Sequence, residues 1–360
     1  MKKGNVIIFG ATGFLGRYLT RHYLDQGREV VAVARHTKGI DERAMFLEWD
    51  GRTPGPWSLA LEGAALVINL TGKSVNCRYN KKNRREIMDS RIDSTRAIGE
   101  AIRACRVPPA VWMNASSATW YRHAEDRPQS ERNGEPGEGF SVDVARAWEQ
   151  SFFASADPTE TRMLTLRIGM VLANEPGTVL NVLKRLTLMG LGGTMGDGNQ
   201  RVSWIHMDDL IAAIDKLELA PMIDGAVNLV APSAVTNRQL MSMLRESLKM
   251  PIGIPANDWM IKVGAFLLRP ESELVLKSRW AEPRRLREMG FEFRWPSLMP
   301  ALENLWARRS IAVYFDKLEH SPTVNIKQPV TQPVFAGQMK GVKYEEDTYQ
   351  NHDWFRGECL

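Results

Sequence analysis

Apolar and polar residues follow a regular pattern along most of the chain. Short apolar runs, which predict buried strands, occur at residues 5–9, 29–34, 45–50, 65–70, 110–114, 163–168 and 225–230. Segments whose apolar residues recur at helical intervals occupy residues 15–26, 83–104, 140–153, 179–191, 210–219 and 237–249. Strands that alternate with helices predict an α/β fold, a Rossmann-type doubly wound parallel sheet.

The pattern changes beyond residue 249, where the alternation stops. An aromatic, strand-like piece occurs at residues 291–295, and from about residue 314 the chain is rich in Pro, Gln, Asn and charge without an amphipathic period. Such a composition is typical of a loosely docked or disordered tail. The predicted segments are a core at 1–235 with substrate-side insertions near 122–139 and 175–202, a smaller α+β substrate-side domain at 236–310, and a tail at 311–360.

The first apolar run leads into the glycine-rich sequence Gly10-Ala-Thr-Gly13-Phe-Leu-Gly16. Gly10 permits a tight turn, Gly13 lets the backbone approach a pyrophosphate, and Gly16 lets the following helix pack close to the strand. The N-terminus of that helix presents free N–H groups to an anion. The sequence therefore predicts a dinucleotide site formed by Gly10, Ala11, Thr12, Gly13, Phe14, Leu15 and Gly16.

Further candidate cofactor residues follow the other strands. The second apolar run ends in Arg35, where an NAD enzyme usually has an acidic residue for the ribose 2′-hydroxyl. A cation there favours the 2′-phosphate of NADP, and the alternative is a solvated strand end. Asp50 either meets the adenine edge or begins the turn at Gly51. The remaining candidates at strand ends are Leu70, Thr71, Gly72, Ala115, Ser116 and Ile168.

Composition narrows the classes of partner. The net charge of +5 suits an anionic small ligand and is too diffuse to indicate nucleic acid. Cys77, Cys105 and Cys359 lie far apart, which favours a reducing, cytoplasmic setting. Neither a signal peptide nor a membrane-spanning run is evident, and His and Cys show no metal-site spacing. We expect a small-molecule substrate without nucleic acid, membrane or metal, and the oligomeric state stays open.

A set of short motifs in one order resembles a known family. Besides the glycine-rich turn, they are Asn69-Leu-Thr-Gly72, Asp89-Ser-Arg-Ile92, Ala115-Ser-Ser-Ala118, Trp148-Glu149, Leu166-Arg-Ile-Gly169, Ser203-Trp-Ile-His-Met-Asp-Asp209 and Gly290-Phe-Glu-Phe-Arg-Trp-Pro296. Over residues 4–309 the chain resembles the atypical extended short-chain dehydrogenase/reductases of the NAD(P)-dependent epimerase/dehydratase family. Members carry a C-terminal domain of unknown function, here at about 250–306. The resemblance implies a Rossmann core that binds NADP(H), with no settled reaction.

The resemblance also indicates an unusual catalytic set. Typical members use a serine or threonine with a Tyr-x-x-x-Lys pair, whose lysine holds the nicotinamide ribose and lowers the tyrosine pKa. Matched by Glu149, the tyrosine falls near Phe140 or Ser141 and the lysine near Ala145, so neither phenol nor ammonium is present. The arginine that binds a sugar-nucleotide diphosphate in typical members is replaced by Val202.

Other residues remain as candidates for the chemistry. Ser117 matches the family serine, and Arg91 falls where typical members have a helix asparagine and is a cofactor candidate. Tyr121 is the phenol nearest Ser117 in sequence, and it is either a substitute acid/base or a residue that only packs the loop. The same loop also offers His123, Glu125 and Asp126. Two functions follow: an NADP(H)-dependent oxidoreductase or epimerase, or a catalytically idle NADP(H)-binding redox sensor.

Overall fold

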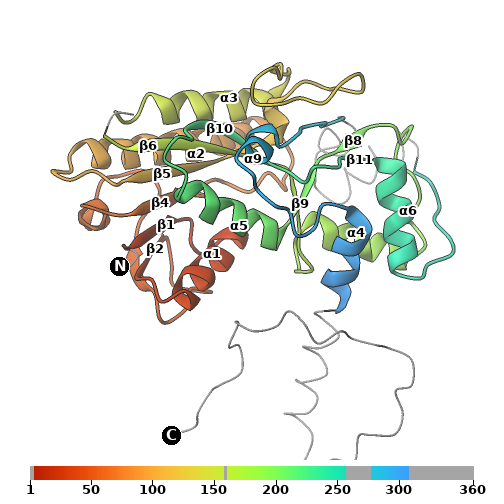
Figure 1. The fold of residues 1–360 in the computed structure, drawn as a ribbon, viewed down its shortest axis with the longest axis horizontal. Coiled ribbons are helices and arrows are strands. Elements are labelled where there is room, and N and C mark those ends of the chain that lie inside the picture. Colours follow the sequence, from red (N-terminus) through yellow and green to blue (C-terminus); the bar gives the residue numbers. More distant parts are fainter. Residues whose placement is uncertain (1–3, 158–159, 257–276, 308–360) are drawn as a thin grey trace, which may run out of the picture. The chain divides into compact units, whose positions relative to one another are not determined.

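A seven-stranded parallel sheet forms the centre of the protein (Figure 1). The computed structural model describes residues 4–157, 160–256 and 277–307. In spatial order the strands are β10 (Gly225–Leu229), β6 (Arg162–Ile168), β5 (Val111–Ser117), β4 (Leu66–Asn69), β1 (Val6–Phe9), β2 (Val30–Ala34) and β3 (Met45–Glu48). Each predicted apolar run overlaps one of these strands, which confirms the predicted Rossmann-type fold.

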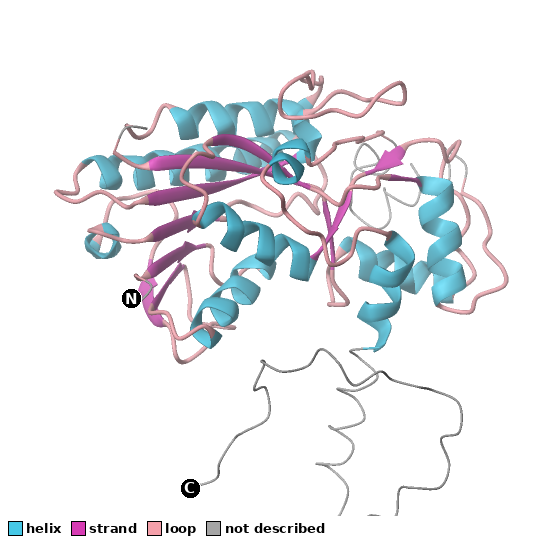
Figure 2. Ribbon diagram, viewed as in Figure 1, coloured by secondary structure: helices cyan, strands magenta, loops and turns pink. Residues whose placement is uncertain are grey.

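Helices cover both faces of the sheet (Figure 2). The helices of the described residues are α1 (Phe14–Asp25), α2 (Lys81–Arg103), α3 (Phe140–Phe153), α4 (Val179–Leu188), α5 (Met207–Glu218), α6 (Asn237–Ser247) and α9 (Arg284–Glu288), with the short 3-10 helices η1 (Pro56–Leu61) and η2 (Ala118–Trp120). Of these, α4 and α6 lie beside the central sheet and pack in a separate apolar cluster. Side chains of a strand alternate between faces. Val6 and Ile8 therefore pack in the core under α1 and α5, while Ile7 and Phe9 pack in the core under α2 and α3.

Two small sheets extend the fold beyond the central one. β7 (Met170–Leu172) pairs in parallel with β9 (Trp204–His206), and β8 (Arg201–Val202) pairs antiparallel with β11 (Val235–Thr236). These strands are two or three residues long, too short for an apolar period to reveal them in the sequence.

The strand expected at residues 291–295 does not form. The rings of Phe291 and Phe293 meet edge-on with centroids 4.8 Å apart and pack against the core. The backbone N–H groups of Arg294 and Trp295 donate to the Asp209 carboxylate at 2.8 and 2.9 Å, so a buried side chain replaces a strand partner. Asp209 therefore fastens this segment to α5 instead of capping the helix, whose N-cap is the buried His206.

The polar insertion near residues 122–139 is anchored at several points. Gln129 exchanges backbone hydrogen bonds with Trp280 and Glu282, and the Asn228 backbone N–H donates to the Glu131 carboxylate at 2.9 Å. The loop is thus joined both to β10 and to the C-terminal segment.

The described residues belong to one compact unit, Met1–Ile311, and the domain boundary at residue 235 stays a prediction. The predicted tail lies outside the described residues. Among the helices that the structure describes, none is both long and apolar enough to cross a membrane.

Candidate functional site

The turn between β1 and α1 is built for close backbone packing. Gly10 has a positive φ of 77°, and a Cβ on Gly16 would lie 2.4 Å from the Gly10 carbonyl oxygen. A side chain at Gly16 would therefore push the helix away from the strand. The N-cap residue Gly13 has no side chain to accept from the first turn of α1, and the N–H groups of that turn are therefore available to an anion.

A cavity of about 730 Å³, which we call the strand-end cavity, opens at the carboxyl ends of β1, β2, β3 and β4. Sheet order reverses between β1 and β4, the position at which ligands bind in open α/β sheets. The predicted cofactor residues that line the cavity are Gly10, Thr12, Gly13, Arg35, Asp50, Leu70, Thr71 and Gly72. The predicted residues outside its lining are Ala11, Phe14, Leu15, Gly16, Arg91, Ala115, Ser116 and Ile168.

The β2–β3 side of the cavity holds an exposed cation. Arg35 follows β2, and within the described part of the chain no carboxylate forms an ion pair with it. Asp50 stabilises the turn that follows β3, because its Oδ1 accepts from the N–H groups of Arg52 and Thr53 at 2.8 and 2.9 Å. These hydrogen bonds, the one from Thr53 most of all, lower the pKa of Asp50. Asp50 therefore begins the turn at Gly51, which is the second of its two predicted roles.

Buried amides fix the ends of β4 and β5. Asn69 Nδ2 donates to Asn114 Oδ1 at 2.7 Å, and Asn69 Oδ1 accepts from the Thr71 N–H at 3.0 Å. Thr95 on α2 accepts from Trp148 Nε1 on α3 at 3.0 Å and lies beside the two amides. The Thr71 hydroxyl is buried in the cavity wall without a partner among the described residues. An orphaned hydroxyl, a glycine cradle and an unpaired arginine together fit a phosphorylated dinucleotide.

The segment after β4 crosses the start of α2. Lys73 contacts the Glu86 carboxylate and donates from Nζ to Asn83 at 3.0 Å, while the Lys73 backbone N–H donates to Ser90 at 2.9 Å. Beneath this segment, Arg91 Nη1 donates to the carbonyls of Lys73 and Ile87 at 3.1 and 2.9 Å. Arg91 therefore supports the cavity floor from below.

A buried polar network lies at the ends of β5, β6 and β10. Arg167 and Glu149 form a two-pronged ion pair with N–O distances of 2.9 and 2.7 Å, and each side chain is 7% exposed. Ser116 donates to the same carboxylate at 2.6 Å. The Arg167 guanidinium carbon lies 3.7 Å from the ring centroid of Trp120. The motifs around Glu149 and Arg167 are visible in the sequence, but their pairing requires the fold.

The phenol of Tyr121 belongs to this network. Its hydroxyl donates to Asn228 Oδ1 at 2.8 Å and accepts from Arg167 at 3.0 Å, and the side chain has no exposed surface. Burial raises the pKa of Tyr121 to about 12, despite the opposing effect of Arg167. The catalytic role predicted for Tyr121 does not fit this environment, because both hydrogen-bonding functions are used and the phenolate is disfavoured.

Ser117 and Ser116 differ in what their hydroxyls do. Both belong to β5 and not to the following loop, so their side chains point to opposite faces. Ser116 faces Glu149, whereas Ser117 is half-buried and accepts from the Thr119 N–H at 3.2 Å at the start of η2. The Ser117 hydroxyl hydrogen is thus left for a ligand beyond the carboxyl end of β5.

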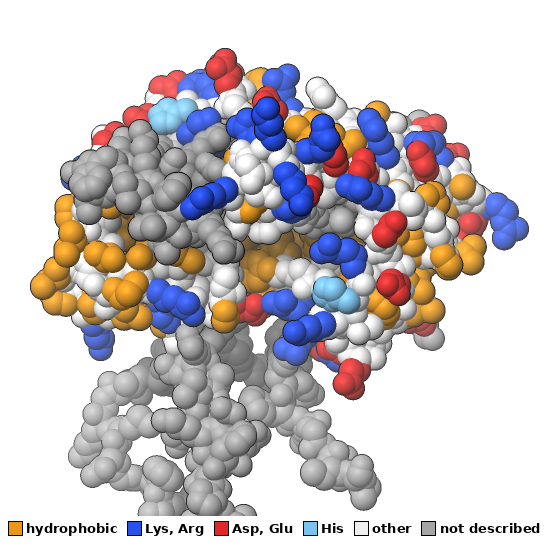
Figure 3. Space-filling model, turned by 180° about the vertical axis from the view of Figure 1, so that it is seen from behind, with side chains coloured by type: hydrophobic (Ala, Val, Ile, Leu, Met, Phe, Trp, Pro, Cys, Tyr) orange, Lys and Arg blue, Asp and Glu red, His pale blue; other side chains and the backbone are white. Residues whose placement is uncertain are grey.

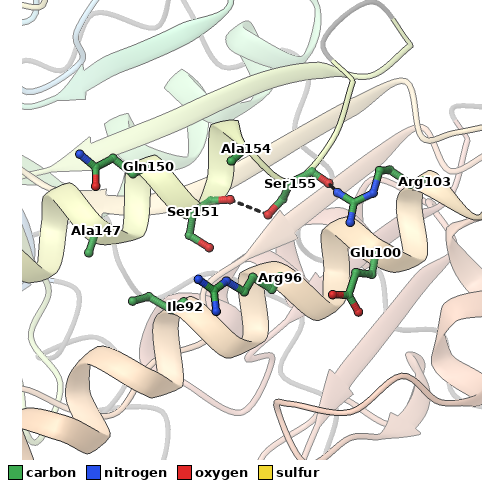
Figure 4. A pocket seen from close by; sticks show the side chains of 9 residues that line it. All are labelled: Ile92, Arg96, Glu100, Arg103, Ala147, Gln150, Ser151, Ala154 and Ser155. Atoms are coloured by element: carbon green, nitrogen blue, oxygen red, sulfur yellow. Dashed lines mark hydrogen bonds between the residues drawn. The ribbon is translucent and has the colours of Figure 1, made fainter.

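A second cavity of about 490 Å³ lies between α2 and α3, away from the strand ends (Figure 4). Its lining includes Arg96, Glu100 and Arg103 from α2 and Gln150 and Ser151 from α3. It shares no lining residue with the strand-end cavity. On the face of the molecule opposite to Figure 1, Lys and Arg side chains are interspersed with Asp and Glu side chains (Figure 3).

Comparisons with known proteins agree with this geometry. The profile of the NAD dependent epimerase/dehydratase family matches residues 6–222, and a domain of unknown function, DUF1731, matches residues 258–305. The chain is 28% identical over 302 residues to the epimerase family protein SDR39U1 homolog, chloroplastic, of Arabidopsis thaliana, covering 82% of this chain and 85% of the relative. It is 28% identical over 306 residues to the epimerase family protein YfhF of Bacillus subtilis, covering 85% and 99%.

Solved structures give the same result. The crystal structure of human epimerase family protein SDR39U1 with NADPH superimposes with a TM-score of 0.73 and 26% identity, over 84% of this chain and 98% of that one. A UDP-N-acetylglucosamine 4-epimerase from Methanobrevibacter ruminantium, 15% identical with a TM-score of 0.68, shares the fold. The family profile covers more than half of the chain, and the chain therefore belongs to the NAD-dependent epimerase/dehydratase family.

Proposed function

We propose that the protein binds NADP(H) in the strand-end cavity and acts as an NADP(H)-dependent oxidoreductase or epimerase on a small molecule. The glycine cradle with Arg35 beside it carries this proposal. The free N–H groups of α1 suit a pyrophosphate, and the unpaired guanidinium of Arg35 suits a 2′-phosphate. The NADPH in the human relative's crystal structure supports the same cofactor.

The order of the strands supports a proposed placement of the two halves of the dinucleotide. Arg35 at the end of β2 takes the adenosine half, and the turn after β1 takes the pyrophosphate. The nicotinamide half then extends over β4 and β5, towards Ser117. When bound, the cofactor supplies or accepts a hydride, and Ser117 donates a hydrogen bond to a substrate carbonyl or hydroxyl.

The acid/base chemistry is the unusual part of the proposal. Ala145 stands where the resemblance places the lysine, and the Tyr121 phenol is buried. At the positions of the usual pair, α3 then offers no general base with a pKa near neutral pH. We propose that proton transfer relies on His123 or on a group of the substrate. The His123 side chain is half-exposed on the neighbouring loop; its Nδ1 accepts from the Ser278 N–H at 3.1 Å, and its Nε2 lies 3.6 Å from the Glu125 carboxylate.

The buried phenol also favours a second function. A protein that binds NADP(H) without turnover, and reports the cofactor's redox state, needs the glycine cradle and Arg35 but no acid/base group. The two functions differ in one observable property, which is whether the bound cofactor changes its oxidation state.

Hydride exchange tests the enzymatic function. The full chain is loaded with NADPH and mixed with a panel of sugar nucleotides, carbonyl compounds and quinones, while nicotinamide absorbance is followed. We expect exchange with at least one class and a slower rate for Ser117→Ala. Ser151→Ala is the matched control, since that hydroxyl lies in the α2–α3 cavity. Exchange that Ser117→Ala leaves unchanged contradicts the assignment of Ser117, and no exchange with any compound favours the sensor.

A further inference from the structure

Arg91 is a half-buried cation without an acidic partner among the described residues. Its guanidinium donates to two carbonyl oxygens, those of Lys73 and Ile87, and lies over the ring of Trp148, whose centroid is 4.9 Å from the guanidinium carbon. None of these groups carries a full negative charge. Burial lowers the pKa of Arg91 to about 10, offset only by Tyr79, so the guanidinium stays protonated at neutral pH.

Two neighbouring cations, in contrast to Arg91, have carboxylate partners. Lys73 pairs with Glu86, and Arg167 pairs with Glu149. Of these three cations, Arg91 is the one without a carboxylate partner within the described chain. Water screens a half-buried charge less than an exposed one, so the field of Arg91 reaches nearby groups.

The guanidinium lies directly beneath the cavity floor. A Cβ built on Gly72 would lie 3.0 Å from Arg91 Cζ and 3.2 Å from Nη2. Gly72 lines the cavity and follows β4, on the side of β1 away from β2 and Arg35. The charge of Arg91 is therefore next to the half of the site that the proposed function assigns to the nicotinamide.

We propose that Arg91 makes this site select the reduced form of the cofactor. The oxidised nicotinamide ring carries a positive charge and the reduced ring is neutral, while the rest of the dinucleotide is the same in both forms. The guanidinium thus repels NADP+ and leaves NADPH unaffected. This inference rests on the proposed cofactor site but not on turnover, and it applies equally to an enzyme and to a sensor.

The selectivity has two measurable consequences. We expect the unmodified chain to bind NADPH about tenfold more tightly than NADP+, which corresponds to about 1.4 kcal/mol. By linkage, the same tenfold preference raises the midpoint potential of the bound two-electron couple by about 30 mV. Both quantities are properties of binding and need no substrate.

Calorimetric titration with NADPH and with NADP+ tests the role of Arg91. Arg91→Gln and Arg91→Met remove the charge, and we expect each to reduce the preference for NADPH at least threefold, mainly through tighter binding of NADP+. Arg91→Lys keeps the charge and should retain the preference. Arg96→Gln is the matched control. It removes the same charge from the same helix, but Arg96 lines the α2–α3 cavity (Figure 4).

The outcomes separate this inference from the proposed function. An equal loss of affinity for both nucleotides on charge removal would show that Arg91 only supports the floor, which overturns the inference. Equal affinities of the unmodified chain for NADPH and NADP+ overturn it without any variant. Failure of the unmodified chain to bind either nucleotide contradicts the proposed function itself.

Discussion

The two halves of the strand-end cavity are built by different means. On the β1–β2 side, the groups that we propose to bind the cofactor are backbone atoms of one short turn and a single exposed arginine, Arg35. On the β4–β5 side, side chains from α2, α3, β5, β6 and β10 meet in buried networks around Asn69 and Glu149. The first half is specified locally, and the second depends on the correct assembly of the whole sheet.

This difference predicts how each half responds to substitution. Changes on the β1–β2 side should alter ligand preference with little effect on folding, because Arg35 is exposed. Changes on the β4–β5 side should first alter stability, because buried charges lose their partners.

Removal of the Glu149 carboxylate should have the largest effect. Glu149→Gln leaves the buried Arg167 guanidinium without a counter-charge, and we expect a loss of about 3–5 kcal/mol in the free energy of unfolding, measured with urea. Glu86→Gln is the control, since its pair with Lys73 is about one-third exposed and such pairs contribute at most about 1 kcal/mol. Equal stability of the Glu149→Gln and Glu86→Gln variants would contradict the predicted importance of the buried ion pair.

A substitution on the β1–β2 side should change the preference for NADPH over NADH. Arg35→Asp removes a charge-assisted contact to the 2′-phosphate, and we expect the preference for NADPH over NADH to fall by about 1.5–3 kcal/mol, or roughly tenfold to a hundredfold. Calorimetric titration with both nucleotides measures this, and Arg106→Asp, on the exposed surface before β5, is the charge-matched control. Equal affinities of the unmodified chain for NADPH and NADH would contradict the role of Arg35.

The same contrast explains what the sequence could predict. Gly10, Gly13 and Gly16 lie within one short turn, so their spacing indicates both the local structure and the ligand. The partners Glu149 and Arg167 lie 18 residues apart on different elements, and only the packing of α3 against the sheet brings them together. For Tyr121, proximity to Ser117 in sequence suggested catalysis, but the chain at η2 turns the phenol into the interior.

The strand expected at residues 291–295 shows the same limit. Its aromatic residues are typical of strands, yet the two backbone N–H groups that a neighbouring strand would satisfy are taken by Asp209, more than 80 residues earlier. The strand propensity of a short segment carries no information about a hydrogen-bond partner so far away in the sequence.

The smallest predicted effect concerns alkaline pH and Tyr121. The phenol has a pKa of about 12 in the folded protein against 10.0 when unperturbed, so it is neutral in both states below pH 10. Between pH 10 and 12 the unfolded chain loses this proton while the folded chain keeps it, and stability therefore falls as the pH rises. Relative to Tyr121→Phe, the unmodified chain should lose about 1 kcal/mol more between pH 9 and pH 11. Urea unfolding at each pH measures the difference, and parallel curves for the two proteins would show that the phenol reaches water in the folded state.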